Sequence, residues 1–177
     1  MACYSAIALT NDAPLTDKVE PSQGVTGNAA ETATLNDCGL YAAQSMLRVL
    51  GVPSRIDDLR GASAYRYPVT GVPEGEGYSL ADLRRLMDSF GVSVQGFRLE
   101  PAVLSQIPLP AILRLRGRGG GHFVALHHVD SGDVAQLYDP LLGVVRLPLS
   151  ILVERWVNAE NQGIALLVDT KGQPATR

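Results

Sequence analysis

The clearest helical pattern in the chain follows residue 39, where apolar residues recur at intervals of three and four. The repeating positions are Leu40, Ala43, Leu47 and Leu50. This spacing predicts an amphipathic helix. Gly51 and Pro53 end it, because neither residue continues a helix well. Asn36 and Asp37 are good N-cap residues, so we expect Cys38 at or within the first turn.

Two further segments combine helical spacing with start signals. One runs from Ile56 to about Ala62 and opens with two aspartates. The other begins after Ser79. Together with Asp82, Ser79 forms a variant of the capping box in which the shorter aspartate takes the place of glutamate. Gly91 ends this second helix, whose apolar stripe consists of Leu80, Leu83, Leu86, Met87 and Phe90.

Short apolar or alternating runs separated by turn residues dominate the second half of the chain, and this pattern predicts β-strands. The expected strands cover residues 92–99, 111–116, 122–129, 134–138, 143–147 and 163–168. Short helices are expected near 103–104 and over 148–156. Gly117–Gly121 is expected to be a glycine-rich turn and Asp130–Asp133 a hairpin turn. Helices followed by an antiparallel meander predict an α+β fold with segregated halves.

The first part of the chain has no sustained period and is broken repeatedly by turn-forming residues. We therefore expect an extended arm over 1–34, a folded domain over 35–170 and a polar tail over 171–177. Such an arm is ordered only when something holds it; the two candidates are its own domain and a larger protein assembly. Residues 63–78 are expected to form a long polar loop. Loops of this length often serve as lids or binding loops, and the alternative is a merely tolerated insertion.

The composition is that of a globular protein, with 46% hydrophobic and 19% charged residues and a net charge of -3. A chain of 177 residues is long enough for one domain with a sizeable core. The nearest approach to a basic cluster consists of Arg114, Arg116 and Arg118. On a strand these would share one face, which we interpret as a solvated strand edge and not as a nucleic-acid groove.

No run approaches the ~20 apolar residues of a membrane-spanning helix. The N-terminus lacks the basic region of a signal peptide. Neither a membrane partner nor a nucleic-acid partner is therefore predicted, and the localisation is left open.

The two cysteines are Cys3 and Cys38. They could pair, but two are too few for a disulfide framework, and we expect an unpaired Cys38. A sulfur in the first turn of a helix lies near unsatisfied backbone N–H groups, which favours the nucleophilic thiolate. The alternative is an inert cysteine buried in a core helix.

His122 and Asp139 lie at opposite ends of a predicted hairpin, the first at the start of one strand and the second at the end of the next. Those two ends are neighbours in an antiparallel pair. A carboxylate beside Nδ1 of His122 would orient the ring and leave the other nitrogen to face a thiol. Cys38, His122 and Asp139 would then form the arrangement that activates a cysteine nucleophile. Taken alone, Asp139 before a proline is also an ordinary strand-to-turn signal.

A metal site is the competing interpretation of the histidines. On a regular strand, His122 and His128 share one face and His127 points to the other. A third ligand would have to be a carboxylate or Cys38, and no ligand spacing supports one. We therefore expect no metal and no cofactor.

Several segments, which follow one another along the chain in the family's order, resemble motifs of the C39 peptidases. These are papain-like cysteine peptidases best known as the leader-cleaving domains of bacteriocin transporters. The segments are Asp37-Cys38-Gly39, Tyr78–Leu83, Gly120–Leu126, and Tyr138-Asp139-Pro140 followed by Gly143. The resemblance covers about Asn36 to Leu147. It implies a papain-like fold, with a helical N-terminal half that carries the catalytic cysteine at a helix N-terminus and a C-terminal antiparallel β-sheet.

The resemblance also implies roles for individual residues. Cys38 would be the nucleophile, His122 the general base and acid, and Asp139 the residue that orients His122. The family usually has a glutamine six residues before the cysteine, where this chain has Thr32. The side chain of Asn36 and the backbone N–H of Cys38 are the expected replacement donors to the oxyanion; one such donor typically contributes about 10²–10³ in rate.

The cleft is expected to be rimmed by the 63–78 loop and the glycine turn, with Gly120, Gly121 and Tyr78 as substrate-binding residues. The leading hypothesis is a cysteine peptidase acting on a peptide or protein, with cleavage after small residues such as glycine implied by the resemblance. The alternatives are a catalytically weak domain that binds within a larger assembly, a hydrolase of peptidoglycan peptides, and another acyl transfer such as transglutamination.

Overall fold

The computed structural model describes residues 37–64, 77–117 and 120–169 of the chain. Its helices are α1 (Cys38–Val49), α2 (Ile56–Ala62), α3 (Leu80–Ser89), the 3₁₀ helix η2 (Pro101–Gln106) and α4 (Leu149–Trp156). Its strands are β1 (Val94–Leu99), β2 (Ala111–Gly117), β3 (Gly120–Val129), β4 (Val134–Asp139), β5 (Gly143–Pro148) and β6 (Gly163–Val168). The predicted arm, the polar tail and most of the 63–78 loop lie outside the described residues.

The strands form one antiparallel sheet in the order β1-β6-β2-β3-β4-β5. Strands β2 to β5 make the expected meander, but β6 returns to lie between β1 and β2, so the prediction of a simple meander is wrong there. The sequence of β6 explains its place. Its last four residues are all buried, which suits a strand covered on both faces.

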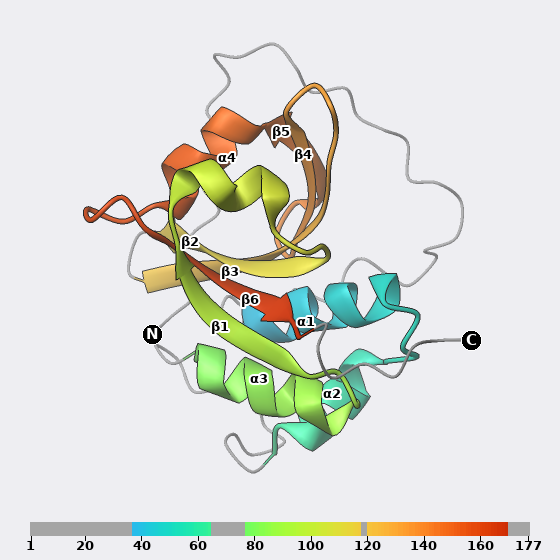
Figure 1. The fold of residues 1–177 in the computed structure, drawn as a ribbon. Coiled ribbons are helices and arrows are strands. Elements are labelled where there is room, and N and C mark those ends of the chain that lie inside the picture. The colour runs from blue at the N-terminus through green and yellow to red at the C-terminus, as the bar shows by residue number, and fades with distance from the viewer. Residues whose placement is uncertain (1–36, 65–76, 118–119, 170–177) are drawn as a thin grey trace.

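Helices cover both faces of the sheet (Figure 1). One buried cluster joins α1, α2 and α3 to one face through Ile112, Phe123, Ala125 and Leu166. A second cluster lies on the other face, where Leu152 and Trp156 of α4 pack on Leu113, Val124 and Leu126. The alternation of buried residues along β2 and β3 therefore divides the core into two layers.

The helix starts follow local signals only in part. The capping box of α3 is confirmed: Ser79 Oγ accepts from the Asp82 N–H at 3.1 Å, and the Asp82 carboxylate accepts from the Ser79 N–H at 3.0 Å. Asp37 occupies the N-cap position of α1 but its side chain makes no capping bond. Instead the Arg60 guanidinium donates to the Asp37 carboxylate at 3.3 Å, so an ion pair to α2 replaces the cap.

Gly39 lets α1 pack closely on the start of α3. A Cβ atom on Gly39 would lie 2.9 Å from Tyr78 Cβ and 3.0 Å from a methyl group of Leu83. Real Cβ atoms do not approach that closely, so a side chain at residue 39 would push the two helices apart. The glycine after Cys38 thereby sets where the first turn of α1 sits.

Two predictions about the glycine and arginine segment are wrong. The turn is shorter than Gly117–Gly121, because Gly117 pairs with Gly120 and Arg116 with Gly121 across β2 and β3. Strand β2 also lies inside the sheet, between β6 and β3, so Arg114 and Arg116 do not mark a solvated edge. Within the described ranges, no helix is long and apolar enough to span a membrane.

Candidate active site

Cys38 is the first residue of α1 and is 2% exposed. The backbone N–H of Phe123 on β3 donates to its Sγ at 3.4 Å. The sulfur therefore lies against the residue that follows His122, although 85 residues separate Cys38 from Phe123 in the chain. The helix N-terminus and this N–H group both direct positive dipole ends at the sulfur, which stabilises a thiolate when the residue is reduced.

Cys38 is disulfide-bonded in the structure, so the prediction that it is unpaired is wrong. The sequence pattern carries no information on the oxidation state of a thiol, which explains the error. A sulfur in a disulfide is not an attacking thiolate. Any chemistry by Cys38 therefore requires that this bond first be reduced. The other cysteine of the chain, Cys3, lies outside the described residues.

His122 and Asp139 lie together at the ends of neighbouring strands, with 3.0 Å between Nε2 of the ring and Oδ1 of the carboxylate. Their side chains are 3% and 13% exposed. The predicted contact used Nδ1, and the structure uses Nε2 instead, because strand spacing does not fix how a ring is turned. With the proton on Nε2, the neutral ring presents Nδ1 as its acceptor.

A backbone contact holds the carboxylate of this pair in place. The backbone N–H of Leu141 donates to the same Oδ1 atom of Asp139 at 2.8 Å. Nδ1 of His122 is buried and makes no hydrogen bond within the described part of the chain. A buried polar atom without a partner costs free energy, and such atoms are often functional. Within the described residues, Nε2 is thus the only ring nitrogen of His122 that has a hydrogen-bond partner.

Asp37, next to Cys38, is the one carboxylate buried at the start of α1, at 3% exposure. Arg60 pairs with it and also with Asp57 at 3.5 Å. Burial lowers the pKa of Arg60, but the hydrogen bond to Asp37 and the nearby negative groups outweigh this and raise it overall. Sequence reasoning missed Arg60, since nothing local links it to a residue 23 positions away.

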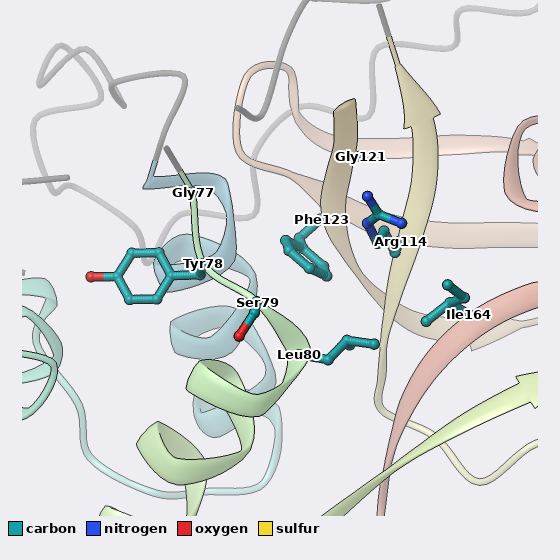
Figure 2. A pocket seen from close by; sticks show the side chains of 8 residues that line it. All are labelled: Gly77, Tyr78, Ser79, Leu80, Arg114, Gly121, Phe123 and Ile164. Carbon is teal, nitrogen blue, oxygen red and sulfur yellow. The ribbon is translucent and has the colours of Figure 1, made fainter. Parts of the chain in front are cut away.

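A pocket of about 290 Å³ lies between the start of α3 and the sheet, beside Phe123 (Figure 2). It is lined by Gly77, Tyr78, Ser79, Leu80, Arg114, Gly121, Phe123 and Ile164. Two of the three predicted substrate-binding residues, Gly121 and Tyr78, are thus at the pocket. The ring of Tyr78 points away from it (Figure 2), and its hydroxyl lies 2.9 Å from that of Ser63. Gly120, the third, is the first residue of β3.

The prediction that His122 and His128 share one face of a regular strand is wrong. A register shift between Leu126 and His128 interrupts β3 and pairs His128 with Gln136, so simple alternation from His122 does not hold. His127 Nε2 lies 2.9 Å from Ser45 Oγ on α1. Among the described residues, no group of three potential ligands could hold a metal ion.

A sequence model of the peptidase C39 family matches residues 28–172. The chain belongs to the peptidase C39 family. The resemblance seen in the sequence motifs is therefore confirmed. Of the two donors predicted for the oxyanion, the backbone N–H of Cys38 belongs to the first residue of α1, and the side chain of Asn36 lies outside the described residues, as does Thr32.

Two curated relatives of this C39 chain carry the name "Probable functional amyloid protease FapD". The protein of Pseudomonas aeruginosa is 32% identical over 130 residues, which cover 71% of this chain and 55% of the relative. That of Pseudomonas fluorescens is 28% identical over 81 residues, which cover 46% and 35%. The chain thus spans about half the length, or less, of these relatives.

Solved structures support the fold. A double glycine motif protease from an AMS/PCAT transporter, solved in complex with the leader peptide, has a TM-score of 0.57 at 22% identity, covering 74% of this chain and 82% of that one. The peptidase C39 like domain of a toxin secretion ATP-binding protein from Vibrio parahaemolyticus has the same TM-score and identity, with coverage of 75% and 96%. The predicted α+β, papain-like fold with the cysteine at a helix N-terminus is thereby confirmed.

Proposed function

We propose that this C39 chain is a cysteine peptidase in which Cys38 is the nucleophile, His122 the general base and acid, and Asp139 the residue that orients His122. One observation carries the proposal. His122 is held through Nε2 by Asp139, while its buried Nδ1 has no partner among the described residues and the neighbouring Phe123 contacts the Cys38 sulfur. A ring with one nitrogen fixed and the other available can activate a thiol that comes within hydrogen-bond reach of the available nitrogen.

The proposed reaction starts from reduced Cys38. Nδ1 of His122 accepts the thiol proton, and the thiolate attacks the carbonyl carbon of the peptide bond. The resulting imidazolium is stabilised by the Asp139 carboxylate. His122 then gives its proton to the leaving amine, and a thioester on Cys38 remains. Water attacks this thioester while His122 accepts a proton from it, so the products are a carboxylate and the regenerated thiol.

The oxyanion of the tetrahedral intermediate needs hydrogen-bond donors. The backbone N–H of Cys38, at the N-terminus of α1, is proposed as one, and the side chain of Asn36 as a second. Each would have to lie within hydrogen-bond distance of the attacked carbonyl oxygen. Substitution of Asn36 by alanine is expected to slow acylation by about 10²–10³ if that side chain is a donor.

The proposed substrate is a peptide or protein segment in extended form. The relative from the AMS/PCAT transporter was solved with a leader peptide, and the curated relatives are named as probable functional amyloid proteases. These likenesses support cleavage of a polypeptide after small residues. That a larger protein assembly holds the N-terminal arm stays a prediction.

A second candidate function is a binding domain without turnover. The disulfide at Cys38 favours it, because a site that stays oxidised cannot acylate. Thr32 in place of the family glutamine points the same way. Reduction separates the two candidates, since only a peptidase gains activity from it.

The test uses the full chain, reduced, with a fluorogenic peptide library that contains Gly-Gly sequences. Cys3→Ala serves as the matched control, because it leaves Cys38 as the only thiol of the chain. We expect cleavage by the reduced wild type and by Cys3→Ala, and a loss of about 10³ or more in Cys38→Ala. Cleavage that survives Cys38→Ala, or no cleavage by the reduced wild type, would overturn the proposal.

A further inference from the structure

The interface between α1 and β3 joins the two elements that carry the proposed nucleophile and general base. Cys38 is the first residue of α1, and His122 lies on β3. One contact across this interface involves the reacting sulfur, to which the Phe123 N–H donates at 3.4 Å. Another lies farther along both elements, where Nε2 of His127 is 2.9 Å from Oγ of Ser45. The proposed reaction uses no atom of this second contact.

The two contacts lie at similar distances along the helix and along the strand. Ser45 comes about two turns after Cys38, or about 10 Å along the helix axis, so both side chains lie on one face of α1. His127 lies about 13 Å beyond Phe123 in an extended strand. α1 therefore runs alongside β3 in the same direction, and the second contact holds it about 10 Å away from the reacting sulfur.

His127 reaches α1 from an irregular point of the strand. The residues on either side of it pair with consecutive residues of β4, Leu137 and Gln136, so β4 has no residue opposite His127. An extra residue of this kind forms a β-bulge, which bends the strand and changes the direction of a side chain. Such bulges are common next to active sites. The bulge thus accompanies the contact between the His127 ring and the hydroxyl of Ser45.

The contact between Ser45 and His127 adds a directional restraint to this interface. Both side chains are half-buried. Burial lowers the pKa of His127, so its ring is neutral at neutral pH, and a hydroxyl can pair with either kind of ring nitrogen. The apolar burial that also holds α1 on the sheet is non-directional, whereas a hydrogen bond weakens steeply as its distance and angle change. The bond therefore resists sliding and rotation of α1 on β3.

We propose that Ser45 and His127 are positioning residues: their hydrogen bond holds α1 against β3 and thereby keeps the nucleophile within reach of the general base. The inference rests on the proposed peptidase function. The Cys38 sulfur gains a covalent bond to the substrate during acylation, so its own contact with Phe123 cannot serve as a constant anchor. The Ser45–His127 bond can, because neither side chain takes part in the chemistry. A misplacement of about 1 Å can lower a rate about 10²-fold, so small movements of α1 matter.

The alternative is that the bond stabilises the fold without affecting catalysis. Its removal would then lower the free energy of unfolding and leave both kcat and the reactivity of Cys38 unchanged in the folded chain. These two readouts decide between a positioning role and a stabilising one.

The experiment measures kcat and KM of the reduced full chain on one peptide that the wild type cleaves, with circular dichroism to establish that each variant is folded. Ser45→Ala and His127→Leu both remove the bond. Each should lower kcat about tenfold and leave KM within about twofold, since the reacting groups are misaligned while the peptide still binds. Their double variant should be about as slow as either alone, because the effects of partners in one bond do not add. His127→Gln, whose amide can still pair with the hydroxyl, should keep kcat within about twofold.

The second readout is alkylation of Cys38 by iodoacetamide in reduced chains that also carry Cys3→Ala. Its rate near pH 6 should fall in Ser45→Ala, because the general base then meets the sulfur less well. Gln44→Leu is the matched control. Gln44 adjoins Ser45 on α1, and its amide donates to the backbone oxygen of Ser54, between α1 and α2, at 3.2 Å. This variant loses a hydrogen bond of the same helix and should keep kcat and the alkylation rate within about twofold of the wild type.

The outcomes separate the inference from the function on which it rests. If the reduced wild type cleaves the peptide, wild-type kcat in Ser45→Ala and His127→Leu would overturn the inference alone. So would a loss in Gln44→Leu as large as in Ser45→Ala, or independent losses that multiply in the double variant. Ser45→Ala removes a single oxygen atom, so it carries the test by itself if His127→Leu does not fold. No cleavage by the reduced wild type would overturn the proposed function and the inference with it.

Discussion

Replacing Asp139 by asparagine should remove a charge from the site while keeping both of its hydrogen bonds. Oδ1 of Asp139 lies 3.0 Å from Nε2 of His122 and accepts from the Leu141 N–H at 2.8 Å. An amide oxygen at the same position can accept from both groups. The Leu141 N–H selects the oxygen for that position, because an amide nitrogen cannot accept a hydrogen bond. The ring should therefore keep its proton on Nε2 and its orientation.

The size of the effect follows from what is lost. A hydrogen bond to a charged group contributes about 1.5–3 kcal/mol and a neutral one about 0.5–1.5 kcal/mol. The loss of charge in Asp139→Asn should thus cost about 1–1.5 kcal/mol, or about five- to fifteen-fold in kcat/KM. In Asp139→Ala the ring loses its anchor and Nε2 its partner. Losing the orienting carboxylate in other triads costs about 10⁴ in rate, and we expect about 10³–10⁴ here.

The assay is kcat/KM of the reduced variants on one fluorogenic peptide that the wild type cleaves, with thermal unfolding as a check on folding. The reasoning predicts the order wild type, then Asp139→Asn within about fifteen-fold, then Asp139→Ala far below. An asparagine variant as inactive as the alanine variant would show that the amide does not replace the carboxylate as described. An alanine variant with wild-type activity would show that Asp139 does not orient His122.

Three further predictions follow from the same structure. Because Cys38 is disulfide-bonded, peptide cleavage should be absent without a reductant and appear on adding one; equal activity in both conditions would contradict this. Burial lowers the pKa of His127 below 6.5, so the unfolded chain binds that proton more readily. The free energy of unfolding should therefore fall as the pH drops from 6.5 toward the native pKa, and urea titrations should show a weaker pH dependence in His127→Gln; an unchanged dependence would refute the assignment. Gly163→Ala would drive a Cβ atom into the Trp156 ring, whereas nothing lies within 4 Å of one at Gly96. Chemical unfolding should thus show a loss of about 1–3 kcal/mol for Gly163→Ala and a change within about 0.5 kcal/mol for Gly96→Ala; equal losses would be inconsistent with the packing.

Local signals predicted the elements of this fold well. The bounds of α2 and β6 are as expected, and the Ser79–Asp82 capping box is present, because these features depend on residues close together in the chain. The contact between His122 and Asp139 was also predictable, because one hairpin brings the two residues together. A hairpin is the shortest tertiary contact that a sequence can indicate.

The remaining features depend on contacts between distant residues. The insertion of β6 between β1 and β2 is set by which strands find buried partners. The ion pair of Arg60 with Asp37 replaces the expected side-chain cap. The choice of Nε2 over Nδ1 depends on how the ring is turned in the packed site. The register shift in β3 and the disulfide at Cys38 likewise have no signal in the local pattern.

The central claim is that His122 activates the sulfur of Cys38. The most direct measurement is the rate of iodoacetamide alkylation of Cys38 between pH 5 and 9 in the reduced Cys3→Ala chain, with and without His122→Ala. The account predicts rapid alkylation already near pH 6, well below the ordinary thiol pKa of about 8.5, and a fall in His122→Ala to the slow, pH-dependent rate of an ordinary thiol. The same slow profile in both proteins would contradict it.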